Sequence, residues 1–182
     1  MFFAFSYGTF IGFWGAHYAC EKMGCMVLPS GNMNTPGRVQ LIDELGVDVG
    51  IDWHGHRDRG LALSNCLAAY RAGATRVHGC GLGIGERSGI PSMTALIFNL
   101  FVDREYDKLE GYHLRGSYPV NVLLASKMNK LVQSKEPVSL TNRTHTAGVH
   151  QKAVLNDAAT YEAHPLDQFG VTESEILLGP LS

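Results

Sequence analysis

The sequence predicts an α/β fold with a parallel sheet, followed by a mostly helical region. Over the first hundred residues, segments with a strand pattern alternate with segments with a helix pattern, and short connections join them. After about residue 103 the strand pattern disappears. The alternation is compatible with an open sheet and with a closed barrel. A complete eight-stranded barrel needs roughly 250 residues, so in that case the chain holds only the later strands.

Helix and strand markers place the elements in the first hundred residues. The helix expected at 35–46 has Thr35 as its cap, Pro36 in its first turn and Gly46 at its end. Residues 47–56 alternate apolar and polar side chains, as a strand does. The other expected elements are strands at 25–30 and 76–82, helices at 60–74 and 92–102, and a glycine-rich loop at 83–89.

The second half carries helix patterns at 118–133 and 147–163. We therefore divide the chain into residues 1–103, which contain the expected strands, and residues 104–182, which form a helical linker or subdomain. The sequence shows no internal repeat.

Composition excludes several classes of partner. The formal net charge is −2 and no basic run occurs, so a nucleic-acid partner is not expected. The uncharged run at 2–16 is shorter than the ~20 apolar residues of a membrane span, and we expect it to be buried in a larger fold. The four cysteines form no C-x-x-C pair. Such scattered cysteines favour a reduced, cytoplasmic setting.

The segment IDWHGHRDRG, residues 51–60, contains the chemistry expected at the end of a strand. Residues two apart on a strand share a face, so Asp52, His54 and His56 project together. Parallel α/β folds build their sites at the carboxyl ends of strands. Two imidazoles there form half of a divalent-metal site, although the same residues also fit an ordinary polar strand end.

Two other stretches carry candidate polar groups. His150 and Tyr161 are eleven residues apart, about three helical turns, so one helix face accommodates both. The loop at 83–89 lacks the spacing of a dinucleotide-binding fingerprint. We expect its glycines to allow a tight turn with close backbone approach, and Glu86 and Arg87 to brace the loop or to face the site. An ion pair between Glu86 and Arg87 within the loop is an equally open alternative.

Two long segments resemble the 2-isopropylmalate synthase and homocitrate synthase family. They read HGHRDRGLALSNCLAAYRAGATRVHGCGLGIGERSG at 54–89 and THTAGVHQKAVLNDAATYEAHPLDQFGV at 144–171. Members of this family are metal-dependent TIM-barrel enzymes that condense acetyl-CoA with a 2-oxo acid. The resemblance implies a partial TIM (β/α)8 barrel, made of its later strands, and a following helical subdomain. It also implies a role in amino-acid biosynthesis, of leucine or lysine.

The resemblance implies a role for six residues. His54 and His56 match the metal-binding histidines, and the metal is Zn, Mn or Mg. Asp52 and Ser30 match substrate-binding positions. His150 and Tyr161 match a catalytic pair that reaches into the neighbouring subunit's site, which implies a homodimer.

The chain also departs from the family pattern. The family's first-strand motif, an Arg followed by Asp or Glu, supplies a third metal ligand, and no such motif is found here. This favours an alternative in which the chain is a non-catalytic fragment or accessory subunit. A second alternative is a metal-dependent lyase similar to hydroxymethylglutaryl-CoA lyase. That group is expected to lack the GIGERSG loop and the GVHQKAVL helix.

Overall fold

The computed structural model describes residues 2–3, 11–46, 50–132, 136–162 and 164–177. The chain separates into two compact units, Met1–Val49 and Gly50–Ser182. The six predicted site residues are divided between them, with Ser30 in the first unit and the other five in the second.

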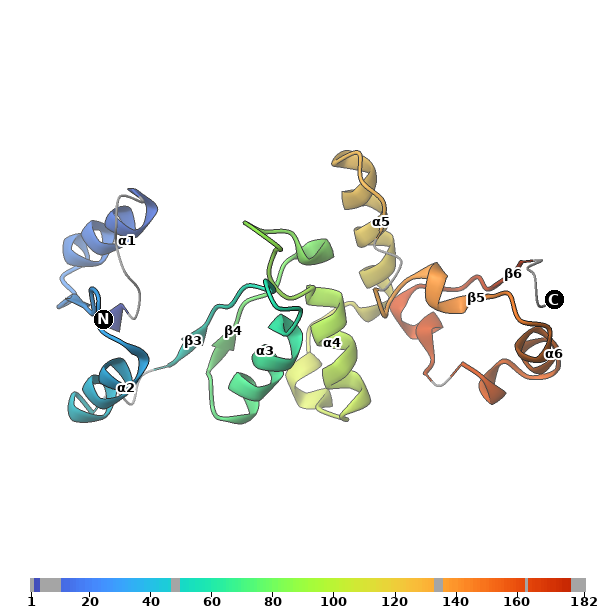
Figure 1. Ribbon diagram of the computed structural model, residues 1–182, viewed down its shortest axis with the longest axis horizontal. Helices are drawn as coiled ribbons and strands as arrows, with labels where there is room; N and C mark the ends of the chain where they lie inside the picture. Colours follow the sequence, from blue (N-terminus) through green and yellow to red (C-terminus); the bar gives the residue numbers. More distant parts are fainter. Residues whose placement is uncertain (1, 4–10, 47–49, 133–135, 163, 178–182) are drawn as a thin grey trace. The chain divides into compact units, whose positions relative to one another are not determined.

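The described residues form six short strands and six α-helices (Figure 1). The strands are β1 Phe2–Phe3, β2 Leu28–Pro29, β3 Asp52–Trp53, β4 Arg76–Val77, β5 Thr144–His145 and β6 Glu175–Ile176. The α-helices are α1 Ile11–Lys22, α2 Thr35–Glu44, α3 Ala62–Arg71, α4 Met93–Val102, α5 Ser117–Lys127 and α6 Gly148–Asn156. Single 3-10 turns are η1 Gly81–Gly83, η2 Tyr106–Leu109, η3 Leu114–Gly116, η4 Leu140–Arg143, η5 Ala158–Thr160 and η6 Leu166–Phe169.

In the first unit, β1 and β2 pair in parallel and α1 lies between them in the sequence. Helix α2 follows, and its N-cap is Asn34, whose Oδ1 accepts a hydrogen bond from the Gly37 N–H at 2.9 Å. The prediction that Thr35 caps the helix is therefore wrong by one residue, because the side chain of Asn34, one position earlier, is the N-cap.

The apolar run at 2–16 lies only partly within the described residues, since 4–10 fall outside them. Helix α1, which holds the end of the run, has no buried residue. The part of the run that lies in this helix is therefore not buried, whereas we expected burial. No helix in the described ranges is long and apolar enough to cross a membrane.

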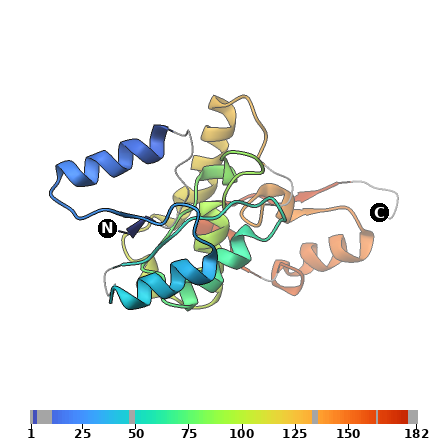
Figure 2. The same cartoon turned by 60° about the vertical axis from the view of Figure 1, so that its left-hand side comes forward.

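The second unit begins with a β-α-β motif. Strands β3 and β4 pair in parallel and α3 connects them, which confirms the predicted alternation at this point. Both ribbon views show α3 beside the two strands (Figure 1 and Figure 2). Trp53 and Val77 pack against a small core that contains Cys66, Leu67 and Leu96. This packing fixes which face of the strand pair is apolar.

A larger core joins α4 to the C-terminal region. Phe169 is fully buried, and its ring meets the rings of Phe98 and Phe101 edge-on at 5.4 and 5.2 Å. The buried members of this core are Ile97, Phe98, Leu109, Val138, Leu166, Phe169 and Val171. Helix α4 begins at its N-cap Ser92, and Ser92 Oγ accepts a hydrogen bond from the Ala95 N–H.

The helices of the second half are shorter than predicted, and strands reappear there. Helix α5 ends at Lys127, and Asn129 adopts a φ of +51°, a conformation that does not continue a helix. Helix α6 ends before Asp157, whose φ is −159°. Strands β5 and β6 form a third parallel pair, so the expected absence of strands after residue 103 is wrong. Two-residue strands are too short to show an alternation pattern.

Candidate functional site

A cluster of three histidines lies just after the paired strands β3 and β4. His54 follows β3 and His78 follows β4, and their Nδ1 atoms are 3.1 Å apart. The ring of His56 lies 5.2 Å from that of His54, centroid to centroid, nearly at right angles. The structure therefore brings His54 and His56 together as predicted and adds a third imidazole.

His78 was not among the predicted site residues. The pattern that reveals it is the register of the strand pair, in which Asp52 faces Arg76 and Trp53 faces Val77. One step further along each strand the partners are His54 and His78. The sequence alone does not show which two strands are neighbours, so this contact could not be predicted from the spacing of His54 and His56.

The histidine cluster affects protonation. The pKa of His54 is lowered below 6.5, first by desolvation and then by the nearby imidazoles of His78 and His56. A lower pKa keeps the ring neutral at neutral pH. Neutral imidazole is the form that donates a lone pair to a metal ion or accepts a proton.

The glycine-rich loop contacts the histidine cluster. Gly83 and Gly89 have φ values of +64° and +84°, and a Cβ on Gly89 would collide with the carbonyl oxygen of Gly83. This confirms the expected tight turn with close backbone approach. The loop then touches the histidine segment twice, since the Arg57 N–H donates to Gly89 O at 2.9 Å and His56 Nδ1 lies 3.1 Å from Glu86 O.

Arg87 braces this loop, which confirms one of the two roles predicted for it. Its Nε donates to Asp58 Oδ2 at 2.7 Å. This ion pair joins the loop to the segment that follows His56. The interaction is exposed to solvent, so it contributes more to the position of the loop than to stability.

The two predicted substrate-binding residues occupy different surroundings. Asp52 is exposed and forms an ion pair with Arg76 across the strands at 3.4 Å. Ser30 follows β2 and is 3% exposed, and its backbone N–H donates to Phe3 O. Its Oγ is buried without a hydrogen-bond partner in the described part of the chain. A buried hydroxyl left in this state can still bond to a bound group.

His150 and Tyr161 are brought together, but not by one continuous helix. His150 lies in α6, whereas Tyr161 lies beyond the break at Asp157. Asp157 Oδ1 accepts a hydrogen bond from the Ala159 N–H, which starts the separate turn η5. Across this bend the two rings stack, with centroids 4.1 Å apart and planes 20° apart. The predicted shared helix face is therefore wrong, and the direct contact of the two rings is a finding that the sequence did not predict.

The residues that could hold a divalent metal supply part of a site. His54, His56 and His78 provide imidazole nitrogens, and the lowered pKa of His54 favours the ligating form. No group of three His, Cys, Asp or Glu side chains in the described residues has the geometry to hold a metal ion. The donor set thus fits a metal through two imidazoles, with a further ligand still required.

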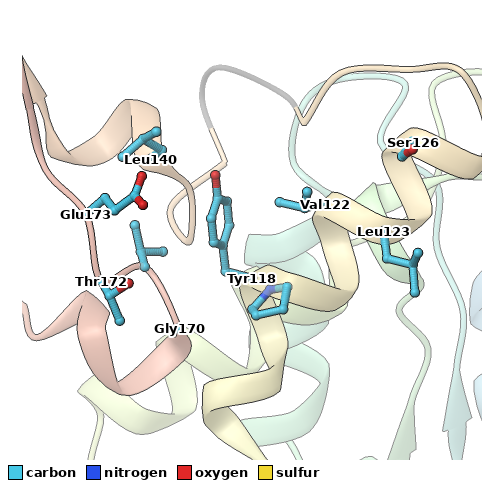
Figure 3. Close-up of a pocket in the computed structure, with 10 residues that line it drawn as sticks. Tyr118, Val122, Leu123, Ser126, Leu140, Gly170, Thr172 and Glu173 are labelled. Carbon is cyan, nitrogen blue, oxygen red and sulfur yellow. The ribbon is translucent and has the colours of Figure 1, made fainter.

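A separate hollow of about 550 Å³ lies along α5. Figure 3 shows Tyr118, Val122 and Leu123 of α5 opposite the segment with Thr172 and Glu173. None of the six predicted site residues lines it. It is therefore separate from the candidate site.

Two regions of the chain match known protein families. Residues 30–117 match the family described as HMGL-like, and residues 138–182 match the homocitrate synthase post-HMGL domain-like family. The first match contains Ser30, Asp52, His54 and His56, and the second contains His150 and Tyr161. The chain therefore carries an HMGL-like region followed by the region that follows it in homocitrate synthases.

Two proteins similar to this chain are synthases. The 2-isopropylmalate synthase of Sediminispirochaeta smaragdinae is 38% identical over 133 residues, which cover 72% of this chain and 26% of that protein. The mitochondrial homocitrate synthase of Schizosaccharomyces pombe is 35% identical over 128 residues, covering 69% of this chain and 30% of that protein. The chain is thus similar to 2-isopropylmalate synthases and homocitrate synthases, which confirms the resemblance seen in the sequence. It spans about a quarter of the length of these curated relatives.

Proposed function

We propose that this chain is part of an acyltransferase that condenses acetyl-CoA with a 2-oxo acid. The observation that carries the proposal is the histidine cluster at the carboxyl ends of two neighbouring parallel strands, inside the HMGL-like region. That is where parallel α/β folds place catalytic groups. The post-HMGL match at 138–182 favours a synthase over a lyase of the hydroxymethylglutaryl-CoA lyase kind.

The fold proposed for the complete protein is a TIM barrel. The parallel pair β3–β4 with its connecting helix is the unit from which such barrels are built. We propose that residues 1–103 supply later strands of the barrel and that residues 104–182 form the helical subdomain. The absence of a disulfide among the four cysteines, all of them in described segments, is compatible with a cytoplasmic setting.

His54 and His56 are the proposed ligands of a divalent metal, Zn, Mn or Mg, with a third ligand from outside the described residues. When bound, such a metal polarises the keto group of the 2-oxo acid. His78 keeps the ring of His54 in place through the Nδ1–Nδ1 contact. Ser30, whose Oγ has no hydrogen-bond partner among the described residues, and Asp52 are each proposed to bind a polar group of the 2-oxo acid.

The stacked pair His150 and Tyr161 handles the proton. A general base removes a methyl proton from acetyl-CoA, and the resulting enolate attacks the keto carbon, whose oxygen takes up a proton. Water then hydrolyses the thioester bond, which releases CoA as its thiol. The imidazole of His150 and the hydroxyl of Tyr161 take part in this proton transfer. In a homodimer the pair serves the neighbouring subunit's site.

The direct test is release of CoA thiol by the purified chain with acetyl-CoA, Zn, Mn or Mg, and a panel that includes 2-oxoisovalerate and 2-oxoglutarate. Release that requires one 2-oxo acid and is lost in the double variant His54→Gln/His56→Gln supports the proposal. His113→Gln is the matched control, because His113 is an exposed histidine outside the cluster.

A second candidate is an accessory chain that binds metal or a full-length subunit without catalysis. The lack of a three-ligand group in the described residues favours it. Folded protein that releases no CoA with any acid would contradict the enzyme proposal for this chain alone. Equilibrium dialysis with Zn, Mn and Mg then shows whether His54 and His56 still bind a metal.

A further inference from the structure

A buried charged network lies next to the His150–Tyr161 pair. Glu162, the residue after Tyr161, uses both carboxylate oxygens. Its Oε2 accepts a hydrogen bond from Nε of Arg143 at 2.8 Å and forms an ion pair with Nη2 of Arg143 at 2.8 Å. Its Oε1 lies 3.3 Å from His145 Nε2. A carboxylate only accepts, so the tautomer with the proton on Nε2 of His145 completes this contact.

The network is rigid because it is buried and multiply bonded. The exposed fractions of the Arg143, Glu162 and His145 side chains are 14%, 9% and 4%. Arg143 also donates from Nη1 to Val171 O at 2.7 Å, which ties it to the main core. Charge-assisted bonds with the same carboxylate from two directions leave it little rotational freedom.

Tyr161, in contrast, is not held by burial. It is 48% exposed, so the hydrophobic effect alone does not select one orientation of its ring. Two ring contacts do so: His145 meets it edge-on at 5.5 Å, and His150 stacks on it at 4.1 Å. His145 is itself held by its contact with Glu162. The charged network therefore restrains Tyr161 in two ways: through the backbone, because Glu162 follows Tyr161 directly, and through the ring contact with His145.

We infer that Arg143, Glu162 and His145 are positioning residues that hold the Tyr161 ring against His150. The inference deepens the proposed function and rests on it for its catalytic meaning. The geometric claim stands by itself: without the network, an exposed tyrosine samples other rotamers and the stack opens. A catalytic group misplaced by about 1 Å loses about 100-fold in rate, so this network would control the proton-transfer step from outside the site.

The test is NMR of the histidine ring protons in the full chain, without substrate or metal. In the unmodified chain the Tyr161 ring current displaces the His150 Hε1 resonance upfield. In Glu162→Gln the side chain is uncharged and has only one acceptor oxygen, so it binds Arg143 and His145 less firmly. The Tyr161 ring then leaves His150, and most of the upfield displacement is lost. Asp103→Asn is the matched control, since it removes a carboxylate from the exposed Arg71–Asp103 pair, and it keeps the displacement.

A second variant covers the case in which Glu162→Gln does not fold. His145→Gln keeps the Arg143–Glu162 ion pair but removes the ring that touches Tyr161, and it too loses the upfield displacement. Folding of each variant is checked by far-UV circular dichroism. A folded variant that keeps the displacement as fully as Asp103→Asn overturns the inference.

Tyr161→Phe separates this inference from the proposed function. It retains the ring, so the His150 displacement stays, but it lacks the hydroxyl, so CoA release is lost. If Tyr161→Phe keeps both, the proposed role of Tyr161 fails while the positioning network remains.

Discussion

Single side chains in this protein owe their chemistry to neighbours that lie far away in the sequence. His54 and His78 are 24 residues apart in the sequence, and yet their Nδ1 atoms lie 3.1 Å from each other. His145 and Glu162 are 17 residues apart and complete a buried network. In both cases a polar residue in an ordinary sequence context gains its role from one contact with a distant part of the chain.

The pH dependence of stability follows from His54. Its pKa is lowered in the folded chain, so as pH falls below about 6.5 the unfolded chain takes up the proton first. The contribution of His54 to the free energy of unfolding is therefore complete above 6.5 and is lost as pH falls through the folded-state pKa. Urea unfolding at pH 7.5 and 5.5 measures this, and His54→Gln flattens the difference.

His113→Gln is the control for that experiment, because His113 is exposed and lies outside the cluster. It should leave the difference between the two pH values unchanged. A His54→Gln variant that keeps the same difference in unfolding free energy between pH 7.5 and 5.5 as the unmodified chain would contradict the role of His54.

His78→Gln should raise the pKa of His54, because the His78 imidazole contributes to lowering it. NMR titration of the His54 ring protons measures this change.

At the scale of elements, helix ends are where polar side chains join distant segments. Glu136 is 6% exposed, and its Oε1 accepts hydrogen bonds from Ser92 Oγ at 2.7 Å and Thr94 Oγ1 at 2.8 Å. Ser92 is the N-cap of α4, so the carboxylate lies near the positive end of that helix. Asn121 of α5 donates to Thr94 Oγ1, and the cluster thereby links α4, α5 and the segment after α5.

Glu136→Ala should destabilise the chain by about 1–3 kcal/mol, because it leaves two buried hydroxyls without their acceptor. Glu136→Gln should cost less, since its amide oxygen still accepts. Urea unfolding monitored by fluorescence gives the values. Glu110→Ala, at an exposed glutamate, is expected to change little, and an equal loss in the Glu136→Ala and Glu110→Ala variants would contradict the buried role.

Phe169→Ala should cost about 3–5 kcal/mol, the usual range for removing a buried aromatic ring. Its ring is fully buried and meets Phe98 and Phe101 of α4. Tyr112→Ala is the control, since Tyr112 is 55% exposed. A midpoint of chemical unfolding that is the same for both variants would show that the core is not centred on Phe169.

At the scale of the whole molecule, the two units differ in how they are stabilised. The second unit contains both hydrophobic cores, which bury side chains from α3 and α4. In the described part of the first unit, helices α1 and α2 bury no residue. Burial of apolar area supplies most folding free energy, so independent stability is expected only of the second unit.

Each unit can be produced and unfolded separately to test this expectation. Residues 50–182 alone should unfold cooperatively, with a thermal midpoint close to that of the full chain. Residues 1–49 alone should show no cooperative transition by circular dichroism. A much lower midpoint for residues 50–182 would mean that the first unit contributes to their stability.

The sequence by itself determined the types of the elements between residues 28 and 102 and the side chains of the candidate site. Period-two alternation marked the strand that contains Asp52 and precedes His54. Gly73, just after α3, has a φ of +101°, which suits a residue that ends a helix. Such features are encoded within a few residues, because they depend on local backbone preferences. The synthase family resemblance was also carried by local motifs, and the comparisons confirm it.

Only the tertiary structure decided which elements are neighbours. It paired β3 with β4 and so brought His78 to His54, and it bent the chain at Asp157 so that Tyr161 stacks on His150. It also paired Arg143 with Glu162, the residue after Tyr161. These contacts join residues 11 to 24 positions apart along the chain, and their formation depends on packing and register, which no local pattern in one sequence specifies.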